Sequence, residues 1–391
     1  ASVTETGAVA LNAINYTGCA AGPYPVIIAP SSGVNTVLSG SVASGALIKL
    51  NGADNVTIDG SNNGSSSKNM TITNSSATSP TAIWIASVGT GAGAADITIK
   101  NCIINTGSNA ATSYGIFAGG ASIGTAGDDN DNLTIQNNTV TKAYYGIYCA
   151  ANATGVNNNL LITQNTIGSA TATDYIGFRG IYAAQATGAT VELNTVFNIE
   201  ATLTNLRAME FGAGFVNSSV SRNIITNINY TSTSFSAGKG ITLSSGTATA
   251  NVTVSNNSIS GLKGQGSSTA SNNSWGIMLL DGGGYNVYYN SINIPDNRTS
   301  TSSTDVHGGI YIASAVTALD IRNNAVSVTG NPGNAAGRMY AVYSLAAAPF
   351  TVSNRNDLYV SGTQHSVGFF SGANQNTLAD WQTATSQDAN S

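Results

Sequence analysis

The sequence predicts an all-β fold, a single right-handed parallel β-helix of roughly 10 to 12 coils, and three observations support this prediction. A six-residue pattern, Ile/Val-x-x-Asn-x-Ile/Val, recurs along the chain. A second short pattern, typified by Gly-Ile-Tyr, lies between its copies. Gly, Asn and Ser occupy the intervening turns, and no stretch of ten residues has the periodicity of a helix.

The asparagine of the first pattern sets the repeat. It recurs at intervals of 27 to 34 residues, at Asn138, Asn165, Asn194, Asn223, Asn257, Asn290 and Asn324. We expect these side chains to form a structural ladder, because asparagine tolerates the left-handed conformation of a sharp turn and its amide can hydrogen-bond the next asparagine. An earlier copy has Cys102 at this position. The unequal intervals indicate insertions at the turns 120–132, 264–274 and 295–306, which we expect to line one side of the solenoid.

The Gly-Ile-Tyr pattern predicts a second strand in each coil. Strand alternation turns its isoleucine inward and the next residue outward. We therefore expect an exposed aromatic stripe with about one ring per 4.8 Å coil, which could bind sugar rings or the apolar surface of a partner. The candidate binding residues are Trp84, Phe117, Tyr148, Tyr182, Tyr311 and Tyr343. The alternative is that these rings stack on one another and are partly covered by loops.

The repeat spans one domain without an internal linker. We expect an irregular N-terminal coil or cap over residues 1–40, the β-helix over 41–370, and a closing segment over 371–391. Within that segment, Thr377 to Trp381 predicts a short helical turn that closes the last coil. A β-propeller would require about 40–45 residues per blade, and a leucine-rich repeat would require Leu ladders that this sequence lacks.

Composition excludes several classes of function. Only 8% of the residues are charged and the formal net charge is −5, so the chain lacks the basic footprint of a protein that binds nucleic acid or an anionic membrane. No run approaches the 18 apolar residues of a membrane span. The three cysteines, Cys19, Cys102 and Cys149, include no Cys-x-x-Cys pair, which argues against a disulfide framework or a zinc site. At most one bridge can form among them.

The Asn ladder and the Gly-Ile-Tyr strand resemble those of right-handed parallel β-helix proteins, a superfamily that includes the pectate lyases. The stretch from Ser41 to Gly60, and Asn356 to Gly362 followed by Leu378 to Trp381, are similar to β-helix regions of very large secreted proteins of Bacteroidetes-type bacteria. This resemblance implies secretion to the cell surface as part of a longer chain. It implies little about activity, because the β-helix supports many unrelated functions.

Asp128, Asp129 and Asp131 are the densest acidic group, in a glycine-rich loop. Alternating carboxylates in a flexible loop could hold Ca²⁺, and no other cofactor is expected. The alternative is a solvated acidic loop tip, because the remaining ligands of an EF-hand are missing.

The catalytic case is weak. Glu192, Glu200 and Glu210 are expected on different sides of the coil, and His307 and His365 are expected to be separate surface or turn residues. A threonine row at Thr98, Thr134, Thr190, Thr253 and Thr351 is typical of an ice-binding face, but Leu161, Ser219, Asn286 and Asp320 interrupt it.

We therefore predict no catalytic residue and a non-catalytic extracellular protein, either an adhesin or a structural component of a surface filament or sheath. Its expected partners are further copies of itself, flanking domains, a polysaccharide or another cell surface. The alternative is a polysaccharide-binding or polysaccharide-degrading β-helix protein, either a lyase or a hydrolase.

Overall fold

The structure is a computed structural model that describes residues 1–13, 24–110, 112–298 and 304–391. It confirms the predicted fold class, since the chain forms a parallel β-solenoid of about 10 turns. Two compact units, Ala1–Thr195 and Val196–Ser391, are described separately below. In each unit, successive strands contribute in turn to three parallel sheets, which we call sheets A, B and C.

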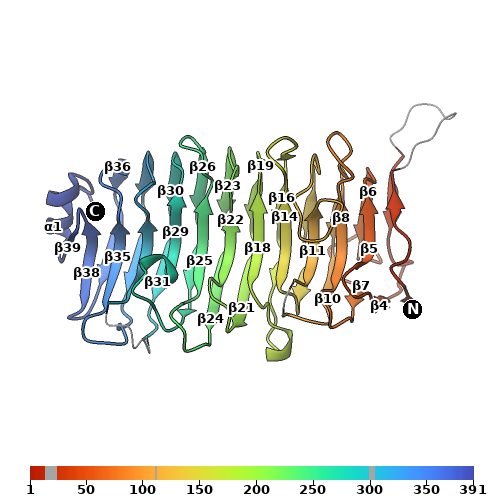
Figure 1. Cartoon of the computed structure of the whole chain (residues 1–391), viewed down its shortest axis with the longest axis horizontal. Coiled ribbons are helices and arrows are strands. Elements are labelled where there is room, and N and C mark those ends of the chain that lie inside the picture. The colour runs from red at the N-terminus through yellow and green to blue at the C-terminus, as the bar shows by residue number, and fades with distance from the viewer. Residues whose placement is uncertain (14–23, 111, 299–303) are drawn as a thin grey trace. The chain divides into compact units, whose positions relative to one another are not determined.

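In the first unit each sheet has six strands, and β8, β11, β14 and β18 of sheet B lie side by side in this order (Figure 1). Sheet A comprises β1 (Ser2–Thr4), β4 (Thr36–Gly40), β7 (Met70–Asn74), β10 (Cys102–Thr106), β13 (Thr139–Thr141) and β17 (Thr166–Ile167). Sheet B comprises β2 (Leu11–Asn12), β5 (Ala46–Asn51), β8 (Thr81–Ala86), β11 (Tyr114–Gly119), β14 (Tyr145–Ala150) and β18 (Arg179–Ala184). Sheet C comprises β3 (Val26–Ile28), β6 (Val56–Asp59), β9 (Thr98–Lys100), β12 (Thr134–Gln136), β16 (Leu161–Thr163) and β20 (Thr190–Glu192). A small pair, β15 (Asn157–Asn158) with β19 (Ala186–Thr187), and a 3-10 helix, Ala172–Asp174, complete the unit.

The second unit repeats this arrangement. Sheet A comprises β21 (Thr195–Ala201), β24 (Ile224–Tyr230), β27 (Ser258–Ser260), β31 (Ser291–Ile294), β34 (Ala325–Val328) and β37 (Asp357–Val360), with β28 (Leu262–Lys263) beside β24. Sheet B comprises β22 (Arg207–Phe211), β25 (Lys239–Ser244), β29 (Trp275–Asp281), β32 (Val306–Ile312), β35 (Arg338–Ser344), β38 (His365–Phe370) and β39 (Ala373–Gln375). Sheet C comprises β23 (Ser218–Ser221), β26 (Val252–Ser255), β30 (Tyr285–Tyr288), β33 (Leu319–Arg322) and β36 (Phe350–Asn354). A 3-10 helix, Ala270–Asn272, and the helix α1 (Leu378–Thr385) complete it.

The asparagines of the repeat stand between sheets C and A and form a buried hydrogen-bonded ladder in each unit. In the first unit the backbone N and the Nδ2 of Asn138 both donate to Oδ1 of Asn165, and Asn165 donates to Asn194 in the same way. Each amide also donates to a carbonyl one coil back, as Asn165 does to Ile135. In the second unit the same series runs through Asn223, Asn257, Asn290, Asn324 and Asn356. Every polar atom of these buried amides thus has a partner, which a buried amide requires.

The expectation that the ladder asparagine itself adopts the left-handed conformation is wrong. The positive φ falls one residue earlier, at Asn137 (51°), Gln164 (59°) and Tyr289 (55°), among others. The preceding residue makes the turn, and its type varies from coil to coil. The asparagine is required for the hydrogen bonds of its side-chain amide and not for a left-handed backbone conformation.

The glycine of the Gly-Ile-Tyr pattern lies where sheet B comes closest to sheet A. A Cβ on Gly115 would lie 2.4 Å from Cγ1 of Val140, and one on Gly276 would lie 2.4 Å from Cγ2 of Ile292. Both partners are inward-facing residues of sheet A. Any larger residue at these positions would displace a buried β-branched side chain.

The last coil is covered by the C-terminal segment. The strand β39 pairs antiparallel with β38, and α1 begins at the N-cap Thr377 as the sequence predicts. Trp381 of α1 is fully buried, and its Nε1 donates to Oδ2 of Asp388 at 2.8 Å. Asp388 in turn accepts from Nδ2 of Asn356, so that it terminates the asparagine ladder. These elements lie together at the C-terminal end of the second unit (Figure 1).

The expectation that the variable loops all line one side is wrong. The loop 120–132 joins a strand of sheet B to one of sheet C, whereas 264–274 follows a strand of sheet A and leads to one of sheet B. The segment 295–306 lies between strands of the same two sheets, and its residues 299–303 are outside the described residues. Insertions therefore occur at two different turns of the coil. The division into segments 1–40, 41–370 and 371–391 of one domain stays a prediction, although β1 to β4 already take part in the three sheets.

Candidate functional site

The aromatic column on sheet B has the predicted register within each unit. In the first unit Trp84 pairs with Phe117, Phe117 with Tyr148, and Tyr148 with Tyr182. In the second unit Met278 pairs with Tyr311, and Tyr311 with Tyr343. Alternation along the strand therefore places these side chains as the sequence predicts.

The expected exposure of this column is wrong. Trp84, Phe117, Tyr311 and Tyr343 are buried, with at most 8% of each exposed, and Tyr148 and Tyr182 are half-buried. Loops cover the rings, because Ile123 packs on the first cluster and Ala270 packs on the second. The indole Nε1 of Trp84 donates to the carbonyl of Gly120 at 3.1 Å. Burial accordingly raises the pKa of Tyr311 to about 12.

The faces of these rings are occupied by one another. The rings of Tyr148 and Tyr182 are stacked with centroids 4.7 Å apart, and those of Phe117 and Tyr148 are 5.3 Å apart. In the second unit the rings of Tyr343 and Phe369 are stacked at 4.5 Å. A sugar that stacks on an aromatic ring needs a free face, and in these pairs the facing sides are not free. This column is largely an outer hydrophobic core in which only Tyr148 and Tyr182 keep partial exposure, and binding by its six aromatic residues stays a prediction.

The three aspartates of the candidate calcium site have separate protein partners. Asp128 accepts from Nδ2 of Asn152, Asp129 accepts from the backbone N of Gly91, and Asp131 accepts from the backbone N of Asn158. Within the described ranges, no three His, Cys, Asp or Glu side chains are grouped so as to hold a metal ion. Calcium binding at Asp128, Asp129 and Asp131 stays a prediction for which the structure supplies no ligand geometry.

The histidines are not surface residues, which corrects the expectation for both. His307 is fully buried: its Nε2 lies 3.1 Å from Oδ2 of Asp305, and its Nδ1 accepts from the backbone N of Ser274. Burial lowers the pKa of His307 to about 4. His365 is also buried, and its Nε2 donates to the carbonyl of Gly330 at 2.8 Å.

The acidic residues considered for catalysis do not converge. In the second unit Glu200 lies in β21 of sheet A and accepts from Asn229, whereas Glu210 lies in β22 of sheet B and pairs with Arg207. Glu192 lies in β20 of sheet C in the first unit. No catalytic pair forms between Glu200 and Glu210, because a glycosidase needs both carboxyl groups at one bond.

Two cysteines are buried free thiols. Cys102 lies in the ladder position and Cys149 lies in β14, and burial raises the pKa of each thiol to about 12. Both thiols therefore remain protonated and weakly nucleophilic at neutral pH. Cys19 lies outside the described residues.

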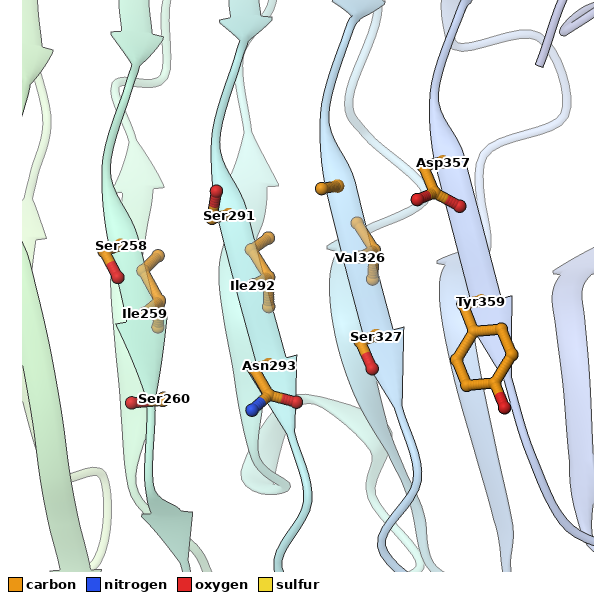
Figure 2. A pocket seen from close by; sticks show the side chains of 11 residues that line it. Ser258, Ile259, Ser260, Ser291, Ile292, Asn293, Val326, Ser327, Asp357 and Tyr359 are labelled. Atoms are coloured by element: carbon orange, nitrogen blue, oxygen red, sulfur yellow. The ribbon is translucent and has the colours of Figure 1, made fainter.

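A surface that the sequence analysis did not single out lies on sheet A of the second unit. A shallow groove of about 320 Å³ crosses β27, β31, β34 and β37, as Figure 2 shows. Ile259, Ile292 and Val326 form its buried floor. Two rows of outward side chains line it, one per coil: Ser258, Ser291, Ala325 and Asp357, and Ser260, Asn293, Ser327 and Tyr359.

Tyr359 and Asp357 give this groove its distinctive chemistry. The side chain of Tyr359 is 55% exposed, and no other aromatic ring of the described residues packs against it. Figure 2 shows its ring further along the same strand as Asp357, on the same surface as the serines and Asn293. The ring can therefore offer a free face to a ligand, whereas the facing sides of the stacked rings of sheet B cannot. Asp357 is the single carboxylate among the described residues that line the groove.

A second groove of about 300 Å³ lies on sheet A of the first unit. Thr73, Asn105 and Thr141 line it, with Lys142 and Asp174 at its edge. The Nζ of Lys142 lies 3.8 Å from Oδ1 of Asp174, and both side chains are partly exposed. The outer surface of sheet A thus presents hydroxyl and amide groups in both units.

One sequence signal could have identified the groove. The outward residues flank the first inward apolar residue after each ladder asparagine, as in Ser258-Ile259-Ser260 and Ser291-Ile292-Asn293. Small polar residues at both flanking positions are typical of a solvated strand. Their exposure depends on whether a loop covers them, which spacing alone does not reveal.

Comparison with known proteins gives likenesses of fold. No family model matches the chain. No curated protein sequence matches it either. Among solved structures, the GH136 lacto-N-biosidase from Eubacterium ramulus is 10% identical with a TM-score of 0.45, and the match covers 86% of this chain. The chain spans 59% of the length of that enzyme.

Two further solved structures have related folds. The DFA-IIIase from Arthrobacter chlorophenolicus A6 is 16% identical with a TM-score of 0.40, covering 82% of this chain and 80% of that one. PfbA, a surface adhesin of Streptococcus pneumoniae, is 12% identical with a TM-score of 0.35, covering 81% of this chain and 80% of the adhesin. These identities and TM-scores concern the β-solenoid fold alone. The function proposed below therefore rests on the geometry of the groove. Within the residues that the structure describes, no helix is long and apolar enough to span a bilayer.

Proposed function

We propose that this chain is a non-catalytic extracellular surface protein that binds polysaccharide through the groove on sheet A of its second unit. The observation that carries the proposal is the pairing of a free aromatic face, Tyr359, with hydroxyl and amide groups on the three preceding coils. Apolar faces for ring stacking and a few placed polar groups are what a carbohydrate site requires. The low charge of the chain agrees with this chemistry.

The acid groups of the groove support binding without cleavage. Hydrolysis of a glycosidic bond needs two carboxyl groups, about 5 to 9.5 Å apart, on either side of the bond. Among the described lining residues Asp357 has no second carboxylate to act with. The groove also contains no Lys, Arg or His among these residues that could act as the base of a lyase.

Retention on polysaccharides tests the proposal. The protein is run through gels that contain one polysaccharide each, from a panel of neutral and acidic chains, and the same mixtures are assayed for reducing and unsaturated ends. We expect retardation by at least one polysaccharide, loss of retardation in Tyr359→Ala, and no release of ends. Tyr24→Ala is the matched control, because Tyr24 is an exposed tyrosine of the first unit.

Two results of this experiment would contradict the proposal. Release of new ends by the wild type, abolished in Asp357→Asn, would establish the degrading alternative and refute the non-catalytic proposal. Retardation by no polysaccharide would refute binding itself. In that case a surface protein that recognises other copies or a protein partner would be the remaining proposal.

A further inference from the structure

We infer that the ligand of the sheet A groove is a neutral glycan whose chain crosses the strands from β27 to β37, with about one sugar residue per coil. This inference rests on the proposed function and deepens it. It concerns three properties that polysaccharide binding alone does not specify. These are the direction of the bound chain, its charge, and the end of the groove that holds it most tightly.

The direction of the bound glycan chain follows from how the polar groups of the groove repeat. Along one strand the groove has two outward residues, such as Ser291 and Asn293, about 7 Å apart. Across the strands the same two positions recur in four successive coils. Neighbouring strands lie about 4.8 Å apart, so the rows extend over about 14 Å. A sugar residue is of similar length to one coil spacing, and three to four residues therefore match the length of the rows.

The charge of the ligand follows from the lining. Uronic acids need cationic side chains or a bridging metal ion to offset their carboxylates. The described lining residues of the groove include no cation, and their one charge is the negative Asp357. The net charge of the chain is also negative, at −5. An acidic chain would be repelled at this surface, whereas a neutral chain needs only the hydroxyl, amide and aromatic groups that are present.

The tightest subsite is the coil of β37. There Tyr359 offers its ring face and Asp357, at the neighbouring outward position, offers a carboxylate that accepts hydrogen bonds from sugar hydroxyls. Hydrogen bonds to a charged acceptor are stronger than those between neutral groups. The middle coils supply Ser291, Asn293 and Ser327, which are neutral and flexible groups. They extend the site without dominating its affinity.

Calorimetric titration with oligosaccharides of defined length tests the inference. The probes are neutral gluco-, manno- and xylo-oligosaccharides of one to six residues, and oligogalacturonates of the same lengths. We expect one neutral series to bind with an affinity that rises with length and levels off at about four residues. Tyr359→Ala should weaken its binding about tenfold, Asn293→Ala about threefold, and Tyr24→Ala not at all.

The outcomes separate this inference from the proposed function. Tighter binding of the oligogalacturonates, or an affinity already maximal for a single sugar, would overturn the inference while polysaccharide binding stands. A neutral series that binds equally well to Tyr359→Ala would also overturn it. The absence of binding by every probe and by every polysaccharide of the gel panel would refute both.

Discussion

At the scale of single residues, the buried amides of the ladder carry much of the specificity of the fold. Asn257 accepts from the backbone N and the Nδ2 of Asn223 and donates to Val220 and Asn290. Removing its side chain leaves several buried groups of the neighbouring coils without partners. Because an unsatisfied buried polar group costs about 1 to 3 kcal/mol, the ladder resists substitution more than an apolar position of the same size.

Asn257→Ala should therefore lower the free energy of unfolding by about 3 kcal/mol. Ser258→Ala, the next residue and an exposed one, should change it by less than about 0.5 kcal/mol. Denaturant unfolding monitored by circular dichroism measures both values. Equal stability of the two variants would show that the ladder is dispensable.

The buried histidines make stability depend on pH in a defined direction. Burial lowers the folded-state pKa of His307 from 6.5 to about 4, and it lowers the pKa of His365 in the same direction. The unfolded chain then binds more protons than the folded chain between these two pH values, so acid favours unfolding. The contribution of His307 is fully present above pH 6.5 and is lost as the pH falls toward 4.

We expect the free energy of unfolding to fall between pH 6.5 and pH 4, and to fall less steeply in His307→Gln. Carboxylates also titrate in the lower part of this range, which is why the difference between variant and wild type is the measured quantity. If the free energy of unfolding fell equally steeply with pH in the wild type and in His307→Gln, His307 would not be a source of the pH dependence. His365→Gln provides a second variant if His307→Gln does not fold.

At the scale of strands, the two outer surfaces with repeating side chains differ in exposure because loops cover only the column on sheet B. The column on sheet B is covered by the loops that contain Ile123 and Ala270, and its rings stack on each other. The rows on sheet A remain open as a groove. Aromatic residues on this fold therefore serve the core where they stack, and we propose that the single exposed ring, Tyr359, serves binding.

Phe117→Ala should lower the free energy of unfolding by about 3 to 5 kcal/mol, as for other buried aromatic residues. Tyr359→Ala should lower it by less than about 0.5 kcal/mol, because that ring is exposed and unstacked. Thermal and denaturant unfolding of the two variants supply the comparison. A large loss of stability in Tyr359→Ala would assign its ring to the fold instead of to a ligand.

The repeat explains which parts of the structure could be predicted from the sequence. The ladder from Asn138 to Asn324 and the register of the Gly-Ile-Tyr strands were predictable, because the same residue must satisfy the same position in every coil. The burial of Trp84 and His307 was not, because irregular loops cover them and loop paths follow no period. The groove was not predictable for the same reason, because the exposure of its small polar residues depends on whether a loop covers them.

At the scale of the whole molecule, the segment that follows β38 covers the last coil of the second unit. Strand edges that lack a partner promote association with other chains. Residues 386–391 and α1 cover the last coil of the second unit, where the backbone N of Asp388 donates to Ser353 and the ladder ends on its carboxylate. We therefore expect this segment to oppose end-to-end addition of a second copy at that coil.

A variant that lacks residues 378–391 should self-associate at concentrations at which the full chain does not. Deletion exposes the surface around Phe370 on which the ring of Trp381 packs. It also removes the carboxylate of Asp388, to which Asn356 donates. Light scattering coupled to size-exclusion chromatography measures the mass of both proteins over a range of concentrations. An unchanged mass for the deletion variant would contradict the capping role.

Hydroxyl-radical footprinting of the tyrosines, with and without a bound neutral oligosaccharide, tests the central claim most directly. The claim is that sheet A, and not the aromatic column of sheet B, is the binding surface. It predicts that oxidation of Tyr359 falls when the oligosaccharide binds, while oxidation of Tyr24, Tyr148 and Tyr182 stays constant. Protection of Tyr148 and Tyr182 with Tyr359 unchanged would contradict it and would return the binding site to sheet B.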